Sequence, residues 1–250
     1  VSYMSRTEAI DRIVALDDYD VEKAAALREH LRIPGMGEST ARYFRDKLAM
    51  RTRAADVGLG VPDFIHVLNY DKLRKFMSTF PPPYVLKPRF QAGAIGIRKI
   101  HKPEELWRAL DELGDKQSFY VLERFLPGEV FHVDSIVCDN TVLFAIVSQY
   151  GEPPMEVAHE GRVFSSQTVL RGSPDEIELQ RENNAVLSAM GLKHGVSHTE
   201  FIKRNDSGTF VFLETSARVG GANIVDLVEA ATGLNLWTEW AKIEVRPNYS

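Results

Sequence analysis

Two neighbouring segments rich in β-branched and aromatic residues constrain this chain more than any other feature of its sequence. Residues 198–202 (HTEFI) and 210–216 (FVFLETS) flank the polar turn sequence NDSG at 205–208. Apolar runs on either side of such a turn predict an antiparallel β-hairpin. Each strand carries one glutamate among its apolar residues, so the register of the hairpin decides how the two acids are placed.

A turn centred on Ser207 puts Glu200 directly opposite Glu214, and strand alternation then brings His198 and Ser216 to the same face. Like charges directly opposite each other destabilise a sheet, and a hard divalent cation between them would resolve the repulsion. Oxygen ligands favour magnesium over zinc. The pattern therefore predicts a magnesium site. Two solvated glutamates on an exposed face are the alternative. A slip of one residue in the register would also separate the carboxylates.

The remaining chain alternates short strands and helices. Strands are predicted at 10–16, after Pro62, and at 84–87, 97–100, 119–125, 129–137 and 141–149. Helices are predicted at 20–31, 38–58, 71–79, 102–113, 175–190 and 220–232. A polar stretch at 150–172 is long enough to be a functional loop. This mixture predicts an α/β protein.

Composition and charge exclude several classes of protein. The net charge of −5 argues against a general nucleic-acid surface. The single cysteine, Cys138, permits no internal disulfide and fits a reducing cytoplasm. No apolar run approaches the roughly 20 residues that span a bilayer.

The chain starts at Val1, and the unit at 10–31 needs neighbouring strands to bury its faces. We therefore expect Val1 to lie inside a longer protein that supplies them.

Lys87 ends a predicted strand and opens a loop of small residues, PRFQAGAIGIR, that contains Gly93 and Gly96. Backbone N–H groups in such a loop can contact phosphate oxygens while the lysine adds charge. The loop is not a P-loop, because no Gly-Lys-Ser/Thr closes it, and its glycines do not open a helix as a dinucleotide fingerprint requires. Phosphate binding is one interpretation, and a plain hairpin turn is the other.

A second constellation lies where an apolar strand ends in Glu123, Arg124, Phe125 and Leu126, with Glu129 close behind. Extended backbone beside apolar side chains can pair with the edge of an adenine, and a nearby carboxylate can hold ribose hydroxyls. A strand that ends in surface charges is the simpler alternative.

Arg218 precedes Gly220 and Gly221 at the predicted start of a helix. An arginine beside a Gly-Gly turn at a helix N-terminus makes an anion site. A surface arginine before a turn explains the same pattern.

Taken in this order, the segments resemble the ATP-grasp superfamily over residues 37–242, nearly the whole chain. The resemblance implies an ATP-grasp fold, in which two α+β lobes clasp the nucleotide. It also implies that residues 1–35 are the C-terminal part of a Rossmann-like preATP-grasp domain. Residues 36–122 would then form the N-terminal lobe with the glycine loop, and residues 123–250 the C-terminal lobe with the metal site.

The resemblance also implies roles for nucleotide-binding residues. Lys47, which precedes a stretch similar to the family's "GVP" strand entry (AADVGLGVP at 54–62), and Lys87 resemble the two nucleotide lysines. Residues 123–126 resemble the linker that clamps adenine, and Glu129 resembles the ribose-side carboxylate.

The metal and phosphoryl sites follow from the same resemblance. Glu200 and Glu214 match the two magnesium-bridging acids, and Arg218 matches an arginine that several members use to hold the transferred phosphoryl group. One departure concerns Ser216, because many members have asparagine there. A serine is a weaker ligand, so a second magnesium would rely on the two glutamates and the phosphates.

The implied activity is a two-step ligation. A carboxylate attacks the γ-phosphorus of ATP to give an acyl phosphate and ADP, and an amine then displaces phosphate. Lys87 and Arg218 are the expected catalytic residues, and ATP with Mg²⁺ the expected cofactors, with Mn²⁺ able to substitute. The segments ETSARVGG at 214–221 and TGLNL at 232–236 resemble most those of ligases that join amino acids. We expect small-molecule carboxylate and amine substrates, no nucleic-acid or membrane partner and a cytoplasmic location, and leave a homodimer open.

Two other functions stay open. A carboxylase-like or nucleotide-biosynthetic member of the superfamily would use the same ATP site with a different second substrate. A catalytically silent ATP-binding module is the non-enzyme alternative, which Ser216 motivates.

Four residues of the stretch 150–172 could close over a substrate side chain, or could pack on the surface: Tyr150, Met155, His159 and Phe164.

Overall fold

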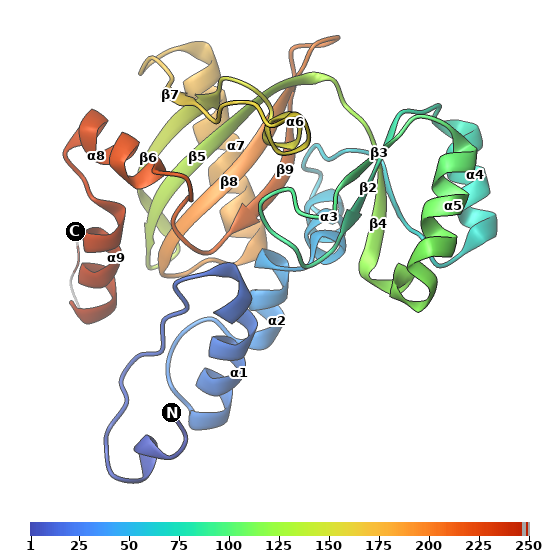
Figure 1. The fold of residues 1–250 in the computed structure, drawn as a ribbon. Helices are drawn as coiled ribbons and strands as arrows, with labels where there is room; N and C mark the ends of the chain where they lie inside the picture. Colours follow the sequence, from blue (N-terminus) through green and yellow to red (C-terminus); the bar gives the residue numbers. More distant parts are fainter. Residues whose placement is uncertain (247–248, 250) are drawn as a thin grey trace.

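A computed structural model describes residues 1–246 and 249, without the side chains of residues 158–160. Two antiparallel sheets carry the fold (Figure 1). The smaller sheet has the order β1 (Phe64–His66), β4 (Tyr120–Arg124), β2 (Tyr84–Pro88) and β3 (Arg98–Ile100). The larger sheet has the order β7 (Ser166–Thr168), β6 (Thr141–Tyr150), β5 (Gly128–Cys138), β8 (Gly195–Arg204) and β9 (Phe210–Ser216).

The smaller sheet is covered by α4 (Tyr70–Thr79) and α5 (Pro103–Leu113), with η4 (Gly114–Phe119) leading into β4 (Figure 1). Helix α5 begins with a proline, which suits a first helical turn. Its buried residues recur three or four positions apart, at Leu106, Ala109 and Leu110. This spacing gives the helix one apolar face, which packs on Leu86 and Leu122 of the sheet.

The larger sheet is covered on both faces. Helices α3 (Lys47–Asp56) and α7 (Pro174–Met190) pack on one face, and α8 (Ile224–Thr232) and α9 (Leu236–Val245) contribute to the core on the other. Strand β5 is therefore buried from Val130 to Cys138. A strand that is enclosed on both faces usually consists of apolar residues throughout. The polar side chains within β5 depart from this rule.

The N-terminal arm lies below the larger sheet (Figure 1). It contains η1 (Met4–Arg6), η2 (Asp18–Asp20), α1 (Val21–Leu31), α2 (Glu38–Ala41) and η3 (Arg42–Phe44). The predicted strand at 10–16 is wrong, because these residues pair with no strand among those described. The side chain of Arg28 satisfies backbone carbonyls instead, donating to Ile13 O at 2.9 Å and to Met36 O at 2.7 Å.

The single helix predicted at 38–58 is also wrong, because it breaks at Arg45 and Asp46. Asp46 has extended backbone, and its side chain accepts a hydrogen bond from Leu48 N at 3.1 Å. The first residue of α3, Lys47, donates its own N–H to Arg89 O at 3.0 Å. Asp46 is thus the N-cap that starts a new helix.

Two further corrections concern the C-terminal half. The helix predicted from Gly220 begins only at Ile224, because Ala222 and Asn223 have φ values of 50° and 65°, outside the helical region. The stretch 150–172, which was predicted as a loop, contains a short helix and a short strand, α6 (Pro154–Glu160) and β7. Helix α9 was not predicted.

The other predicted helices and strands are confirmed within a few residues at their ends. The tight turn at Asp139 and Asn140 joins β5 to β6, with φ values of 49° and 62°. Two positive φ angles are what a two-residue hairpin turn needs.

No described helix is long and apolar enough to cross a membrane. The division into segments 1–35, 36–122 and 123–250 stays a prediction, although α3 packs with the larger sheet.

Candidate active site

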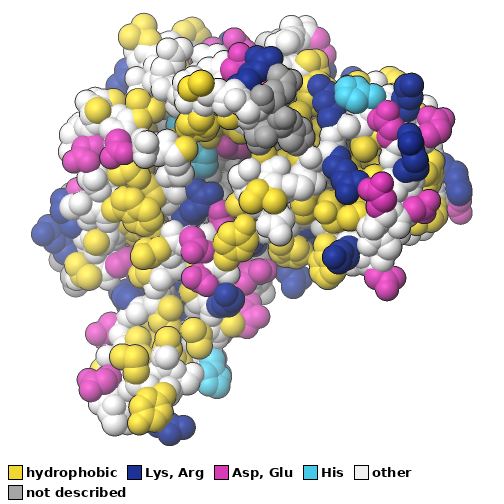
Figure 2. Space-filling model, in the orientation of Figure 1, with side chains coloured by type: hydrophobic (Ala, Val, Ile, Leu, Met, Phe, Trp, Pro, Cys, Tyr) yellow, Lys and Arg dark blue, Asp and Glu magenta, His cyan; other side chains and the backbone are white. Residues whose placement is uncertain are grey.

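A pocket of about 820 Å³ opens where the two sheets meet. All but two of the predicted site residues line it: Lys87, Gly93, Glu123, Arg124, Phe125, Leu126, Glu129, Glu200, Glu214, Ser216 and Arg218. Lys47 borders a small cavity that shares Glu214 and Ser216 with the pocket. Gly96 lies in the glycine loop outside both linings. The face shown in Figure 2 carries acidic and basic side chains interspersed.

The register of the hairpin β8–β9 is confirmed at the acids. Glu200 pairs with Glu214, and His198 pairs with Ser216. Nearer the turn the ladder is one residue out of register, because Phe201 pairs with Phe212. A β-bulge at this point absorbs the extra residue, so the two glutamates lie opposite each other even though the turn is not centred on Ser207.

Glu214 is held by Lys47. The Nζ atom lies 3.0 Å from Glu214 Oε2 and donates to Gln91 O at 2.7 Å, so the lysine links β9 to the glycine loop. Removal of Glu214 from water would raise its pKa, but the charges of Lys47 and Lys87 lower the pKa to about 2. The carboxylate is therefore ionised at neutral pH and offers an anionic ligand to the pocket.

Glu200 is held by Tyr150, whose hydroxyl donates to Glu200 Oε1 at 2.8 Å. Tyr150 was expected in a loop over the pocket, but it ends β6 and is 5% exposed. Its hydroxyl also lies 3.1 Å from His198 Nε2. Met155 and Phe164 line the pocket as expected, whereas the side chain of His159 lies outside the described residues.

Behind His198 lies a buried polar network. Asp134 of β5 contacts His198 Nδ1 at 2.9 Å and His132 Nδ1 at 2.7 Å, and all three are buried. Burial would lower the pKa of His198, but Asp134 raises the pKa to about 10. His198 is therefore a cation at neutral pH. The sequence signal for this network is the presence of His132 and Asp134 within the apolar strand β5.

These three residues could also be considered as metal ligands, because their ligand atoms lie within 4.8 Å of one another. Both histidines already form a hydrogen bond with Asp134, so the carboxylate of Asp134 is occupied by His132 and His198. The set of Glu200, Glu214 and Ser216 offers only oxygen atoms and faces the pocket. That donor set fits a hard cation such as magnesium.

Lys87 forms a buried ion-pair cluster with Glu123 and Arg51. Lys87 Nζ lies 2.7 Å from Glu123 Oε2, and Arg51 Nε lies 2.9 Å from Glu123 Oε1. Burial and, to a lesser extent, the charge of Arg51 lower the pKa of Lys87, and Glu123 opposes them, with a net pKa of about 8. Sequence reasoning missed Arg51, although it shares the buried stripe of α3 with Met50 and Ala54.

The chain that follows Glu123 connects the sheets. Arg124 N donates to Asp63 O at 2.8 Å and Phe125 N to Pro83 O at 3.1 Å, which fixes the linker against the smaller sheet. Lys99 Nζ lies 3.8 Å from the centre of the Phe125 ring, a cation–π contact at the pocket wall. Only glycine fits at 128, because a Cβ there would lie 2.2 Å from Lys203 O.

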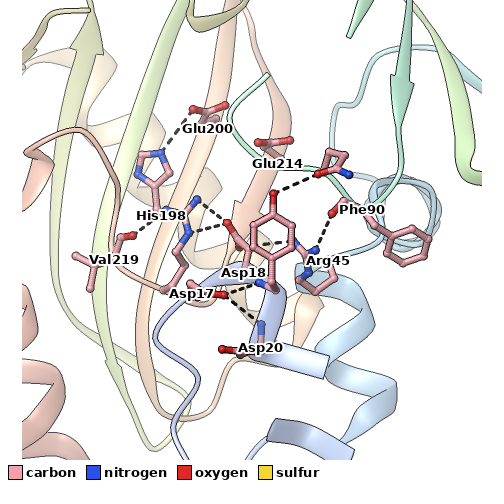
Figure 3. Close-up of polar contacts among 12 residues, drawn as sticks. Asp17, Asp18, Asp20, Arg45, Phe90, His198, Glu200, Glu214 and Val219 are labelled. Atoms are coloured by element: carbon pink, nitrogen blue, oxygen red, sulfur yellow. Dashed lines mark hydrogen bonds and ion pairs between the residues drawn. The ribbon is translucent and has the colours of Figure 1, made fainter. Parts of the chain in front are cut away.

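Arg218 does not stand at a helix N-terminus, since α8 begins six residues later at Ile224. It pairs instead with Asp18 of η2, and Nε and Nη2 both lie 2.7 Å from Asp18 Oδ2 (Figure 3). Nothing in the sequence pattern links these residues, which lie 200 positions apart.

Comparison with known proteins shows the family of this chain. Residues 80–226 match the model of the ATP-grasp domain, more than half of the chain. The chain therefore belongs to the ATP-grasp family. The predicted two-lobed ATP-grasp fold is confirmed.

Curated relatives include an L-arginine-specific L-amino acid ligase of Bacillus subtilis, 28% identical over 241 residues, which is 94% of this chain and 58% of that protein. A D-alanine–D-alanine ligase of Chlorobium phaeobacteroides is 25% identical over 217 residues, 81% of this chain and 59% of that protein. The chain thus spans less than two thirds of the length of either relative.

Among solved structures, an L-amino acid ligase from Bacillus licheniformis superimposes with a TM-score of 0.80 at 23% identity, covering 99% of this chain and 59% of that one. A D-alanine–D-alanine ligase from Bacillus anthracis superimposes with a TM-score of 0.69 at 16% identity, covering 98% of this chain and 82% of that one. At these identities the likeness concerns the fold.

Proposed function

We propose that this chain is the ATP-grasp core of a magnesium-ATP-dependent ligase that activates a carboxylate as an acyl phosphate and couples it to an amine. The observation that carries the proposal is the placement of Glu200 directly opposite Glu214 in one pocket with Lys87 and Arg218. Two carboxylates for metal and two cations for phosphate are what phosphoryl transfer from ATP requires.

In this proposal the nucleotide lies along the seam between the sheets. Lys47 and Lys87 contact its phosphates, and the linker 123–126 receives the adenine. The side chain of Glu123 is engaged by two cations, so contacts to the adenine fall to the linker backbone and to the residues that follow. Glu129 holds the ribose hydroxyls.

Magnesium, when bound, neutralises charge between the ATP phosphates. Glu200, Glu214 and Ser216 are the residues that would hold it. Tyr150 and Lys47 orient the two carboxylates, because each donates to one of them. Arg218 faces the transferred phosphoryl group and, later, the acyl phosphate. Helix α6 and the glycine loop border the pocket and would exclude water from this intermediate.

Amino acids are the proposed substrates. Both curated relatives described above carry names of ligases that join amino acids, and the pocket offers fixed charges together with apolar surface from Met155 and Phe164. A cytoplasmic location fits a chain whose only cysteine, Cys138, is free and buried.

The test is phosphate release from ATP by the full-length protein in a matrix of amino-acid pairs, with product identified by mass spectrometry. We expect magnesium-dependent phosphate release with a subset of pairs and a dipeptide product. Arg218→Ala should lose this activity while retaining ATP binding. Phosphate release with bicarbonate or a nucleotide precursor instead would move the chain to another branch of the family. ATP binding without turnover of any substrate would leave a silent binding module.

A further inference from the structure

The turn η2 brings a buried carboxylate from the N-terminal arm to the proposed reaction centre (Figure 3). Asp17 shapes the turn, since its side chain accepts from Tyr19 N at 2.7 Å and from Asp20 N at 3.2 Å. Asp18, only 4% exposed, points from this turn to Arg218. Its Oδ2 atom accepts a hydrogen bond from Arg218 Nε at 2.7 Å and lies 2.7 Å from Arg218 Nη2 in the same ion pair.

The other contacts of Arg218 leave N–H donors of its guanidinium available to bind an anion. Its Nη1 atom donates to Val219 O at 2.7 Å. An arginine has five N–H donors, and these contacts with Asp18 and Val219 engage at most three of them: Nε and Nη1 donate hydrogen bonds, and Nη2 lies at ion-pair distance from Asp18. The side chain is 20% exposed and borders the pocket. Within the described part of the chain, at least two donors are thus left for the oxygens of a ligand, on a guanidinium that is already oriented.

The same turn reaches the glycine loop. Tyr19 donates its hydroxyl proton to Gln91 Oε1 at 3.2 Å. Arg45, whose Nη1 lies 3.9 Å from Asp18 Oδ1, donates through Nη2 to Phe90 O at 2.6 Å. Turn η2 therefore connects Arg218 in the C-terminal half to the loop that follows Lys87.

We propose that Asp18 is a positioning residue, which orients the guanidinium of Arg218 toward the transferred phosphoryl group. The inference rests on the proposed function, because it assumes that Arg218 contacts that group. A preoriented donor stabilises developing charge without having to reorganise during the reaction. The N-terminal arm thereby contributes to the chemical step, although Asp18 itself touches no substrate.

A double-mutant cycle in the full-length protein tests the coupling. Asp18→Asn keeps the shape of the side chain and removes its charge. We expect kcat to fall by about ten- to a hundredfold, the range for losing a charge-assisted hydrogen bond, with KM for ATP unchanged. In an Arg218→Lys background, which has no guanidinium to orient, the same substitution should not lower the residual kcat further. An equal loss in both backgrounds, or a lower thermal midpoint at unchanged kcat, overturns the proposal.

Asp20→Asn is the matched control, because Asp20 lies in the same turn but is exposed and pairs with Lys23 at 3.2 Å. Its kcat should equal that of the unmodified protein. Equal losses in Asp20→Asn and Asp18→Asn would assign the effect to the turn as a whole and overturn the role of Asp18.

A second measurement does not depend on the ligase reaction. The ¹⁵N-detected Nε–H signal of Arg218, assigned through its absence in Arg218→Lys, should exchange slowly with water and exchange rapidly in Asp18→Asn. A slow signal in a protein without ligase activity would count against the proposed function alone. Rapid exchange in the unmodified, active protein would count against the positioning role alone.

Discussion

Glu200 and Glu214 lie directly opposite each other on β8 and β9, and a bulge between them and the turn maintains this pairing. Removing one of the two charges tests the metal site. We expect Glu214→Gln to weaken binding of Mg-ATP and to abolish turnover, because magnesium loses an anionic oxygen. Calorimetry with and without magnesium measures the effect, and Glu104→Gln on the exposed surface of α5 serves as control. Equal ATP affinity with and without magnesium in the unmodified protein would contradict the metal site.

Lys87 is predicted to contact phosphate even though it is paired with Glu123 in the structure. A charge-assisted hydrogen bond contributes roughly 1.5–3 kcal/mol, so Lys87→Ala should weaken ATP binding by about ten- to a hundredfold. Adenosine affinity should hardly change, since adenosine has no phosphate. If both ligands weaken together in a titration, the lysine has a structural role only.

The pKa of Lys87, lowered by burial to about 8, also predicts a pH dependence. Above pH 8 the free protein carries a neutral amine, so binding of phosphate must be accompanied by uptake of a proton. ATP affinity should therefore fall by up to about tenfold per pH unit above pH 8. Lys87→Arg, which stays charged, should show a flatter profile. Parallel profiles for the two proteins would assign the pH dependence to another group.

Arg51 is fully buried, and its charge is balanced by Glu123. We expect Arg51→Met to lower the free energy of unfolding by about 3–5 kcal/mol, because Glu123 loses a buried partner. Urea unfolding measures the change. Arg74→Met is the control, since Arg74 forms an exposed pair with Asp71 and should contribute little to stability. If Arg51→Met lowers the free energy of unfolding no more than the control does, Lys87 alone compensates the charge of Glu123.

Tyr150 orients Glu200 through its hydroxyl. Tyr150→Phe keeps the ring and removes that donor. Groups that orient metal ligands typically change metal affinity by about 10–100-fold, so we expect the magnesium concentration for half-maximal activity to rise by about this factor. Tyr70→Phe is the matched control, because it removes a hydroxyl that donates to Gln117 Oε1 at 2.8 Å outside the pocket. An unchanged magnesium requirement in Tyr150→Phe would mean that Glu200 does not need this contact.

Much of the site follows from short-range sequence patterns. The hairpin of Glu200 and Glu214, the strand that ends in Lys87 and the linker after Glu123 were all predicted from the alternation of side chains and from turn residues. Such patterns are set by backbone geometry over a few residues, so they can be read without knowledge of the packing. The resemblance of their order to the ATP-grasp superfamily supplied the expected roles.

The partners of these residues depended on the tertiary structure. Glu123 pairs with Arg51 across 72 positions, His198 with Asp134 across 64, and Arg218 with Asp18 across 200. No local periodicity connects residues so far apart. The sequence by itself determined which strands and turns would carry the acids and lysines. Only the packing of the N-terminal arm, α3 and β5 against those strands decided which charges are buried, how their pKa values shift and what orients Arg218.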